Sequence, residues 1–96
     1  MEVIPKDWVD KIFSCMSQFY SSRWDRNFDE SGRESFFKTI WQSGLTGLTY
    51  DQIIYALKLC KKDSENPRAI PPHVMEFFRY AKGTERPYEY RKSSNE

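Results

Sequence analysis

Residue types that support catalysis or metal binding are scarce among the 96 residues of this chain. The single histidine, His73, directly follows two prolines, where we expect an exposed polar residue at a helix start rather than a catalytic base. Cys15 and Cys60 are far apart and lack the CxxC spacing of a metal-binding pair. Asp29 and Glu30 precede an expected helix, where carboxylates interact favourably with backbone N–H groups and the helix dipole. The sequence therefore predicts no enzyme, no metal site and no cofactor.

Basic residues are the remaining candidates for binding. Partner- or phosphate-binding candidates lie near the ends of two expected helices and in the loop between them: Lys58, Lys61, Lys62, Arg68 and Arg79. Cations near helix C-termini also stabilise the helix dipole, so the pattern has a structural explanation as well as a binding one. The phosphate-binding loops GxxxxGK[ST] and GxGxxG are absent from the sequence.

A second basic cluster also contains an aromatic residue. Arg23, Trp24 and Arg26 lie in a polar segment between two expected helices. This mixture can stack on single-stranded bases and contact phosphates, although a loop tryptophan more often anchors its loop to the core. The formal net charge of only +1 excludes the strong positive field of a histone-like protein.

Composition and periodicity predict an all-α protein. The chain is 39% hydrophobic and 17% aromatic, which indicates a packed core. Apolar residues recur at helical spacing, which predicts a compact bundle of about four helices at residues 5–20, 31–43, 50–62 and 72–82. We expect one domain over residues 1–83, a charged and flexible tail over 84–96, and buried thiols at both cysteines. No signal peptide or membrane-spanning run is recognised, so we expect a cytoplasmic protein without a membrane partner.

Helix boundaries are predicted from capping residues. Thr49 and Gln52 form a capping-box pattern, flanked by Leu48 and Ile53 in the spacing of a hydrophobic staple. The remaining expected features are a capping box at Ser31 and Glu34, helix-closing glycines at Gly44 and Gly83, prolines at the first helical positions (Pro5 and Pro71-Pro72), and one apolar face formed by Phe36, Phe37, Ile40 and Trp41.

The order of these pieces resembles a known family. Phe19-Tyr20 is followed by Trp41, by the run GLTGLTYDQIIYAL from Gly44 to Leu57, and by Pro71-Pro72 with Glu76-Phe77. Over about three-quarters of the chain, this arrangement resembles the conserved module of phage replication proteins of the lambda P type, which load the replicative helicase. The positions that carry the resemblance are Trp41, Gly44, Leu48, Thr49, Ile53, Pro71, Pro72 and Phe77.

The resemblance implies an accessory protein of DNA replication. The expected function is a non-enzymatic interaction module that binds the replicative helicase or another primosome component, with single-stranded DNA as a further possible partner. Two alternatives stay open. One is a small helical module that binds single-stranded nucleic acid by itself through its basic residues, and the other is an interaction or adaptor protein unrelated to replication.

Overall fold

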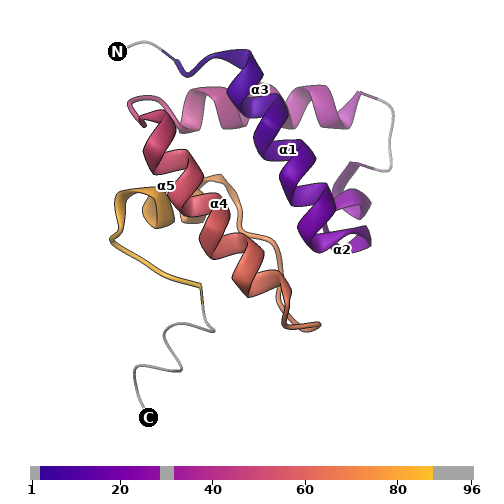
Figure 1. Cartoon of the computed structure of the whole chain (residues 1–96). Helices are drawn as coiled ribbons and strands as arrows, with labels where there is room; N and C mark the ends of the chain where they lie inside the picture. Colours follow the sequence, from indigo (N-terminus) through magenta and orange to yellow (C-terminus); the bar gives the residue numbers. More distant parts are fainter. Residues whose placement is uncertain (1–2, 29–31, 88–96) are drawn as a thin grey trace.

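The computed structural model describes residues 3–28 and 32–87, and within these ranges the regular structure is entirely helical. The elements are α1 (Lys6–Tyr20), α2 (Ser22–Asp25), the 3-10 turn η1 (Arg26–Phe28), α3 (Arg33–Gly44), α4 (Tyr50–Ser64) and α5 (Val74–Lys82). The all-α prediction is therefore confirmed, with five α-helices in the described ranges rather than about four. In Figure 1, α1 and α4 slope down the molecule and α3 crosses behind α1.

The core lies between α1, α3, α4 and α5. The apolar stripe of α1 is buried as its spacing predicts, and it includes Ile12, Phe13 and Met16. Phe13 and Trp41 meet edge to face, with ring centroids 5.6 Å apart. Trp41 in turn packs on Phe77 of α5 at 5.3 Å, so one tryptophan joins three helices.

The start of α4 follows the local sequence. Oγ1 of Thr49 accepts a hydrogen bond from the backbone N–H of Gln52 at 3.2 Å, and the Gln52 side chain accepts one from the Thr49 N–H at 2.9 Å. Leu48 and Ile53 on either side of this capping box are both buried. The capping prediction is confirmed.

Several predicted helix boundaries are wrong. Pro5 is the N-cap of α1 and not its first helical residue, because the helix begins at Lys6. Gly44 does not close α3 in a left-handed conformation, because it is the last residue of the helix and the positive φ in that turn belongs to Gly47. Pro71 and Pro72 do not occupy the first turn of α5, because the helix begins at Val74 after an N-cap at His73.

The helices α3 and α5 approach each other closely at Gly44, which explains the glycine at this position. A Cβ atom at Gly44 would lie only 2.7 Å from Cγ2 of Val74, so a side chain at this position would separate α3 from α5. The other predicted closing glycine, Gly83, does adopt the left-handed conformation at the end of α5, with φ of 77°.

The segment predicted as a polar loop over residues 21–30 is partly helical. It contains α2 and η1. Trp24 of α2 is only 3% exposed, so its expected role as an anchor of this segment to the core is confirmed. Ser31, Asp29 and Glu30 lie outside the described residues. The next helix begins at Arg33 with Gly32 as its N-cap, two residues later than expected.

The predicted apolar face of α3 is only half buried. Phe37 and Trp41 turn toward the interior, whereas Phe36 is 63% exposed and Ile40 is 37% exposed. Neighbouring residues on a helix point about 100° apart, so the second pair lies on a row that faces away from the core. Of the two cysteines, which are both free, Cys60 is buried as expected, while Cys15 is only partly buried.

The described part of the expected C-terminal tail contacts α5. The backbone N–H of Thr84 donates to the Arg79 carbonyl at 3.0 Å, the Arg79 guanidinium meets the Glu85 carboxylate at 2.8 Å, and Pro87 is fully buried. Residues 88–96 of that tail are outside the described ranges. Across the described helices, none is long and apolar enough to span a bilayer.

Candidate binding groove

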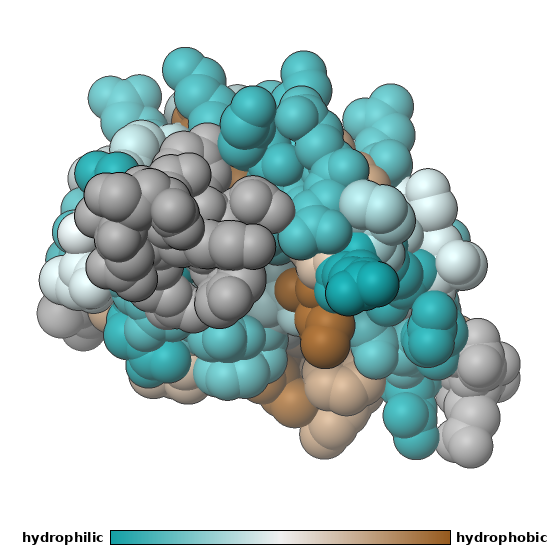
Figure 2. Space-filling model, turned by 90° about the horizontal axis from the view of Figure 1, so that it is seen from below, coloured by the Kyte–Doolittle hydropathy of each residue, from teal (hydrophilic) through white to brown (hydrophobic). Residues whose placement is uncertain are grey.

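A groove of about 560 Å³ separates the α2–η1 segment and α3 from the chain that connects α4 to α5. Its floor is aromatic and consists of Trp24, Phe28, Phe37 and Trp41. One wall is the connecting segment 67–73, and the cationic residues Arg23, Arg26 and Arg68 also line the space. Figure 2 views the molecule from below, the end at which this connecting segment leaves α4 in Figure 1, and shows a small apolar group amid hydrophilic side chains.

Arg23 fixes the connecting segment in place. Its Nη1 donates to the carbonyls of Asn66 at 2.9 Å and Ala69 at 2.8 Å, and its Nη2 donates to the Ser64 carbonyl at 3.1 Å. Its Nε donates to the carbonyl of Tyr20 at 3.3 Å. These four bonds use four of the five guanidinium donors, so Arg23 positions the groove wall and most of its capacity to bind a ligand directly is taken.

Short-range bonds and prolines stiffen the same wall. The backbone N–H of Ala69 donates to the Asn66 carbonyl, and the N–H of Arg68 donates to the Asn66 side chain, both at 3.0 Å. Pro67, with Pro71 and Pro72 further along, restricts φ along the segment. The wall is thus held in one conformation before any partner binds, which lowers the entropic cost of binding.

The aromatic floor is tightly packed. Trp24 and Trp41 are only 3% and 4% exposed, and their rings meet at 86° with centroids 5.7 Å apart. Phe28 contacts Trp24 at 5.3 Å and Phe37 at 5.6 Å. Because the tryptophan faces are covered by neighbouring rings, the floor offers apolar contact without an open tryptophan face for a nucleotide base.

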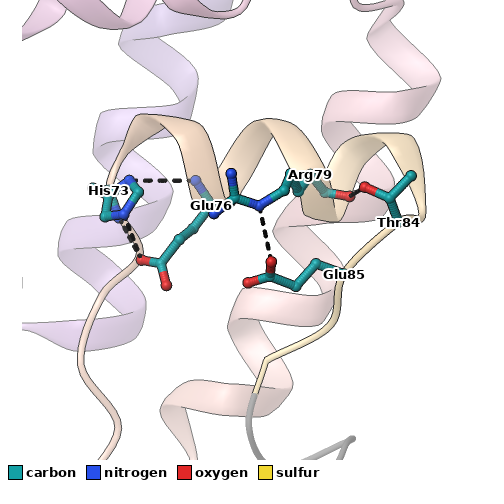
Figure 3. Close-up of polar contacts among 5 residues, drawn as sticks. All are labelled: His73, Glu76, Arg79, Thr84 and Glu85. Carbon is teal, nitrogen blue, oxygen red and sulfur yellow. Dashed lines mark hydrogen bonds and ion pairs between the residues drawn. The ribbon is translucent and has the colours of Figure 1, made fainter.

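His73 lies at one end of the groove and caps α5 (Figure 3). Its Nδ1 accepts a hydrogen bond from the Glu76 backbone N–H at 3.4 Å, and Oε1 of Glu76 accepts one from the His73 backbone N–H at 3.1 Å. His73 is exposed, as the sequence predicts, and its contacts are those of a helix cap.

A buried polar pair lies beside the Arg23 clamp. The Tyr20 hydroxyl donates to Oδ2 of Asp63 at 2.8 Å, and the Arg23 guanidinium lies 5.2 Å from the Tyr20 ring centroid. Burial raises the pKa of the Tyr20 phenol above its ordinary value, and the nearby Cys60 and Asp63 add to this shift. The pair connects the ends of α1 and α4 to the segment that forms the groove wall.

The structure divides the predicted site residues into two sets. Arg23, Trp24, Arg26 and Arg68, which the sequence places in separate clusters, all line the groove. The remaining candidates lie elsewhere, on α4 and α5: Lys58, Lys61, Lys62 and Arg79. Among these, Lys62 pairs with Glu65 at 3.5 Å, and Arg79 with Glu85 at 2.8 Å.

The positions that carry the family resemblance also fall into two sets. Trp41, Pro71 and Pro72 line the groove. The other five are structural, since they cap α4, close the core or allow α3 to approach α5: Gly44, Leu48, Thr49, Ile53 and Phe77. Sequence reasoning did not single out Ile70, which is 83% exposed in the groove wall, although an isoleucine beside two prolines in a polar segment was an available signal.

Comparison with known proteins adds no assignment. No protein-family model, curated protein or solved structure matches this chain. No cluster of three or more metal-ligating side chains occurs within residues 3–28 and 32–87. The function must therefore be inferred from the residues and from the groove that they form.

Proposed function

We propose that this chain is a non-enzymatic interaction module of DNA replication that binds the replicative helicase, or another primosome component, through the groove. The observation that supports the proposal is an apolar groove whose wall is fixed in advance by Arg23. The link to DNA replication comes from the sequence resemblance. Trp41, Pro71 and Pro72 belong both to the family pattern and to the groove lining. The proposal includes a cytoplasmic location.

The dimensions of the groove suit a partner segment better than a large substrate. A volume of about 560 Å³ is enough for a few side chains of a helix or an extended strand. The exposed Ile70 side chain offers this segment an apolar contact at the wall. Such a contact depends mainly on buried apolar surface, so binding should persist at moderate salt.

The experiment is a titration of the full chain, labelled at its N-terminus, against the replicative helicase of the source cell, followed by fluorescence anisotropy. The test variant is Ile70→Asp, which places a charge on the exposed groove wall without disturbing the core. The control is Met75→Asp, which makes the same kind of change at a half-exposed residue outside the groove lining. We expect saturable binding without DNA, weakened about tenfold or more by the first variant only.

Two results contradict the proposal. One is the absence of saturable binding to the helicase at tens of micromolar. The other is binding that requires single-stranded DNA and disappears in the double variant Lys61→Glu, Lys62→Glu, which would assign the function to the basic residues of α4 instead.

A further inference from the structure

We infer that the groove binds an acidic segment of a partner protein, in which carboxylates flank one or two apolar side chains. This inference rests on the proposed function and specifies the chemistry of the partner segment at that site. It follows from the charges around the groove, from the position of Ile70 and from the packing of the aromatic floor.

The cations of the groove come from different walls. Arg26 belongs to η1 and Arg68 to the connecting segment, and both side chains are exposed. Arg23 adds a third positive charge to the lining, with its guanidinium already held by backbone carbonyls. Arginine forms paired hydrogen bonds with carboxylates, so two arginines on separate walls suit carboxylates on either side of an inserted side chain.

Among the described residues, the carboxylates of Asp25 and Glu76 next to the groove already have partners. None of the described residues that line it is acidic. Asp25 of α2 accepts a hydrogen bond from Ser17 of α1 at 2.8 Å, and Glu76 lies 3.6 Å from His73 at the far end. Among the described lining residues, an acidic segment would therefore meet an excess of positive charge, although the whole chain has a net charge of only +1.

The lining favours a protein segment over a nucleic acid. Ile70 is 83% exposed and provides aliphatic surface, which packs on leucine or phenylalanine side chains. Base binding would need an accessible tryptophan face, whereas Trp24 and Trp41 are nearly buried and contact each other edge to face. A partner side chain can instead cover the apolar surface of the groove while its neighbouring carboxylates pair with arginine.

The test uses short fluorescein-labelled peptides and the full chain. The first peptide has a leucine and a phenylalanine flanked by aspartates and glutamates. In the second, serines replace the two apolar residues, and in the third, lysines replace the acids. A labelled oligothymidylate is the nucleic-acid probe. We expect the first peptide to bind most tightly, with the second about tenfold weaker and the lysine peptide and oligothymidylate weaker still.

Variants at exposed positions locate the binding. Arg26→Glu and Arg68→Glu should each weaken binding of the first peptide about tenfold, and Ile70→Ser should weaken it by a similar factor. Lys58→Glu is the matched control, because it makes the same charge change on an exposed part of α4 outside the groove. Equal losses in Lys58→Glu and Arg68→Glu, or tighter binding of the lysine peptide, would overturn the inference. Tighter binding of oligothymidylate, lost in Arg26→Glu, would assign the groove to nucleic acid.

The inference and the proposed function can fail separately. If the helicase binds but its affinity is unchanged in Arg26→Glu and Arg68→Glu, the inference of an acidic partner segment is wrong and the proposed function stands. If the helicase does not bind but the first peptide does, with both arginine variants weakened, the chemistry of the groove is supported and the helicase is not its partner.

Discussion

The hydroxyl of Tyr20 donates a 2.8 Å hydrogen bond to Oδ2 of Asp63, which ties the last turn of α1 to the last turn of α4. Both residues are buried, and Asp63 is the only buried charged residue in the described ranges. A buried carboxylate is stable only when donors surround it. The same corner of the fold contains Arg23, whose guanidinium holds the groove wall, so the stability of the core and the shape of the groove depend on adjacent contacts.

Replacing Tyr20 by phenylalanine should lower the free energy of unfolding by about 1–3 kcal/mol, because a buried carboxylate loses a hydrogen-bond donor while the ring is retained. The control is Tyr55→Phe, which removes a hydroxyl from an exposed position on α4 and should change stability by less than about 0.5 kcal/mol. Urea denaturation of both variants provides the measurement. Equal effects of the two substitutions would show that the Tyr20–Asp63 bond contributes no net stability.

Stability should also fall in alkaline solution. Burial raises the pKa of Tyr20 and Tyr80 above their ordinary 10.0 and that of Cys60 above its ordinary 9.0. Above those ordinary values the unfolded chain releases protons that the folded chain retains, so the unfolding free energy decreases as pH rises. Each group contributes up to about 1.4 kcal/mol per pH unit. Urea denaturation under reducing conditions should show that the unfolding free energy decreases less steeply with pH in Tyr20→Phe than in the parent protein. Parallel decreases in the two proteins would mean that the raised pKa of Tyr20 does not cause the effect.

Gly44→Ala should destabilise the protein by about 1–3 kcal/mol, since its Cβ would lie 2.7 Å from Cγ2 of Val74 and β-branched valine has little freedom to move in a helix. The added methyl group gains helix propensity, but this gain is smaller than the cost of the overlap. In a Val74→Ala background the obstructing methyl is absent, so the same change at Gly44 should cost far less. Thermal or urea unfolding of the four proteins gives the coupling energy, and additive effects would exclude the contact as the cause.

Local patterns were sufficient to predict much of the fold. The α1 stripe, the Thr49 capping box and the left-handed Gly83 each depend on residues within a few positions of one another, and each prediction is confirmed. The start of α5 was predicted at residue 72, because two prolines suggested a first helical turn. In the structure His73 is the N-cap and the helix begins at Val74. Histidine is not among the preferred N-cap residues, so the local signal for a cap at this position was weak.

The groove depends on contacts that no local pattern contains. Arg23 meets the carbonyl of Ala69, 46 residues away, and this bond brings the Arg23–Arg26 cluster next to Arg68. The sequence identified these arginines as binding candidates but placed them in separate groups. Ile70 could be judged exposed only once the path of the connecting segment was known. Gly44 was likewise predicted to close its own helix. The residue is instead required by its contact with Val74 of α5, which leaves no room for a side chain.

Thr49→Ala should lower the free energy of unfolding by about 0.5–2 kcal/mol, because the Gln52 backbone N–H loses its acceptor at the start of α4. Thr39→Ala is the control for loss of a threonine hydroxyl, since this exposed residue bonds back to the Ser35 carbonyl within α3 and alanine is the better helix former. The control should be neutral or slightly stabilising in urea denaturation. A similar loss in both variants would mean that the capping bond is not what stabilises α4.

Ser21→Gly should stabilise the protein by about 1 kcal/mol. Ser21 joins α1 to α2 with φ of 53° and ψ of −126°, the only positive φ at a non-glycine residue in the described ranges. This conformation strains an L-residue with a side chain and suits glycine, and the gain exceeds the extra chain entropy that glycine adds to the unfolded state. The control is Ser14→Gly at an exposed position within α1, where glycine should cost about 0.5 kcal/mol. Changes of opposite sign in the unfolding free energy of the two variants, measured by urea denaturation, would confirm the strain at Ser21. Destabilisation by both substitutions would show that the backbone of Ser21 is not strained.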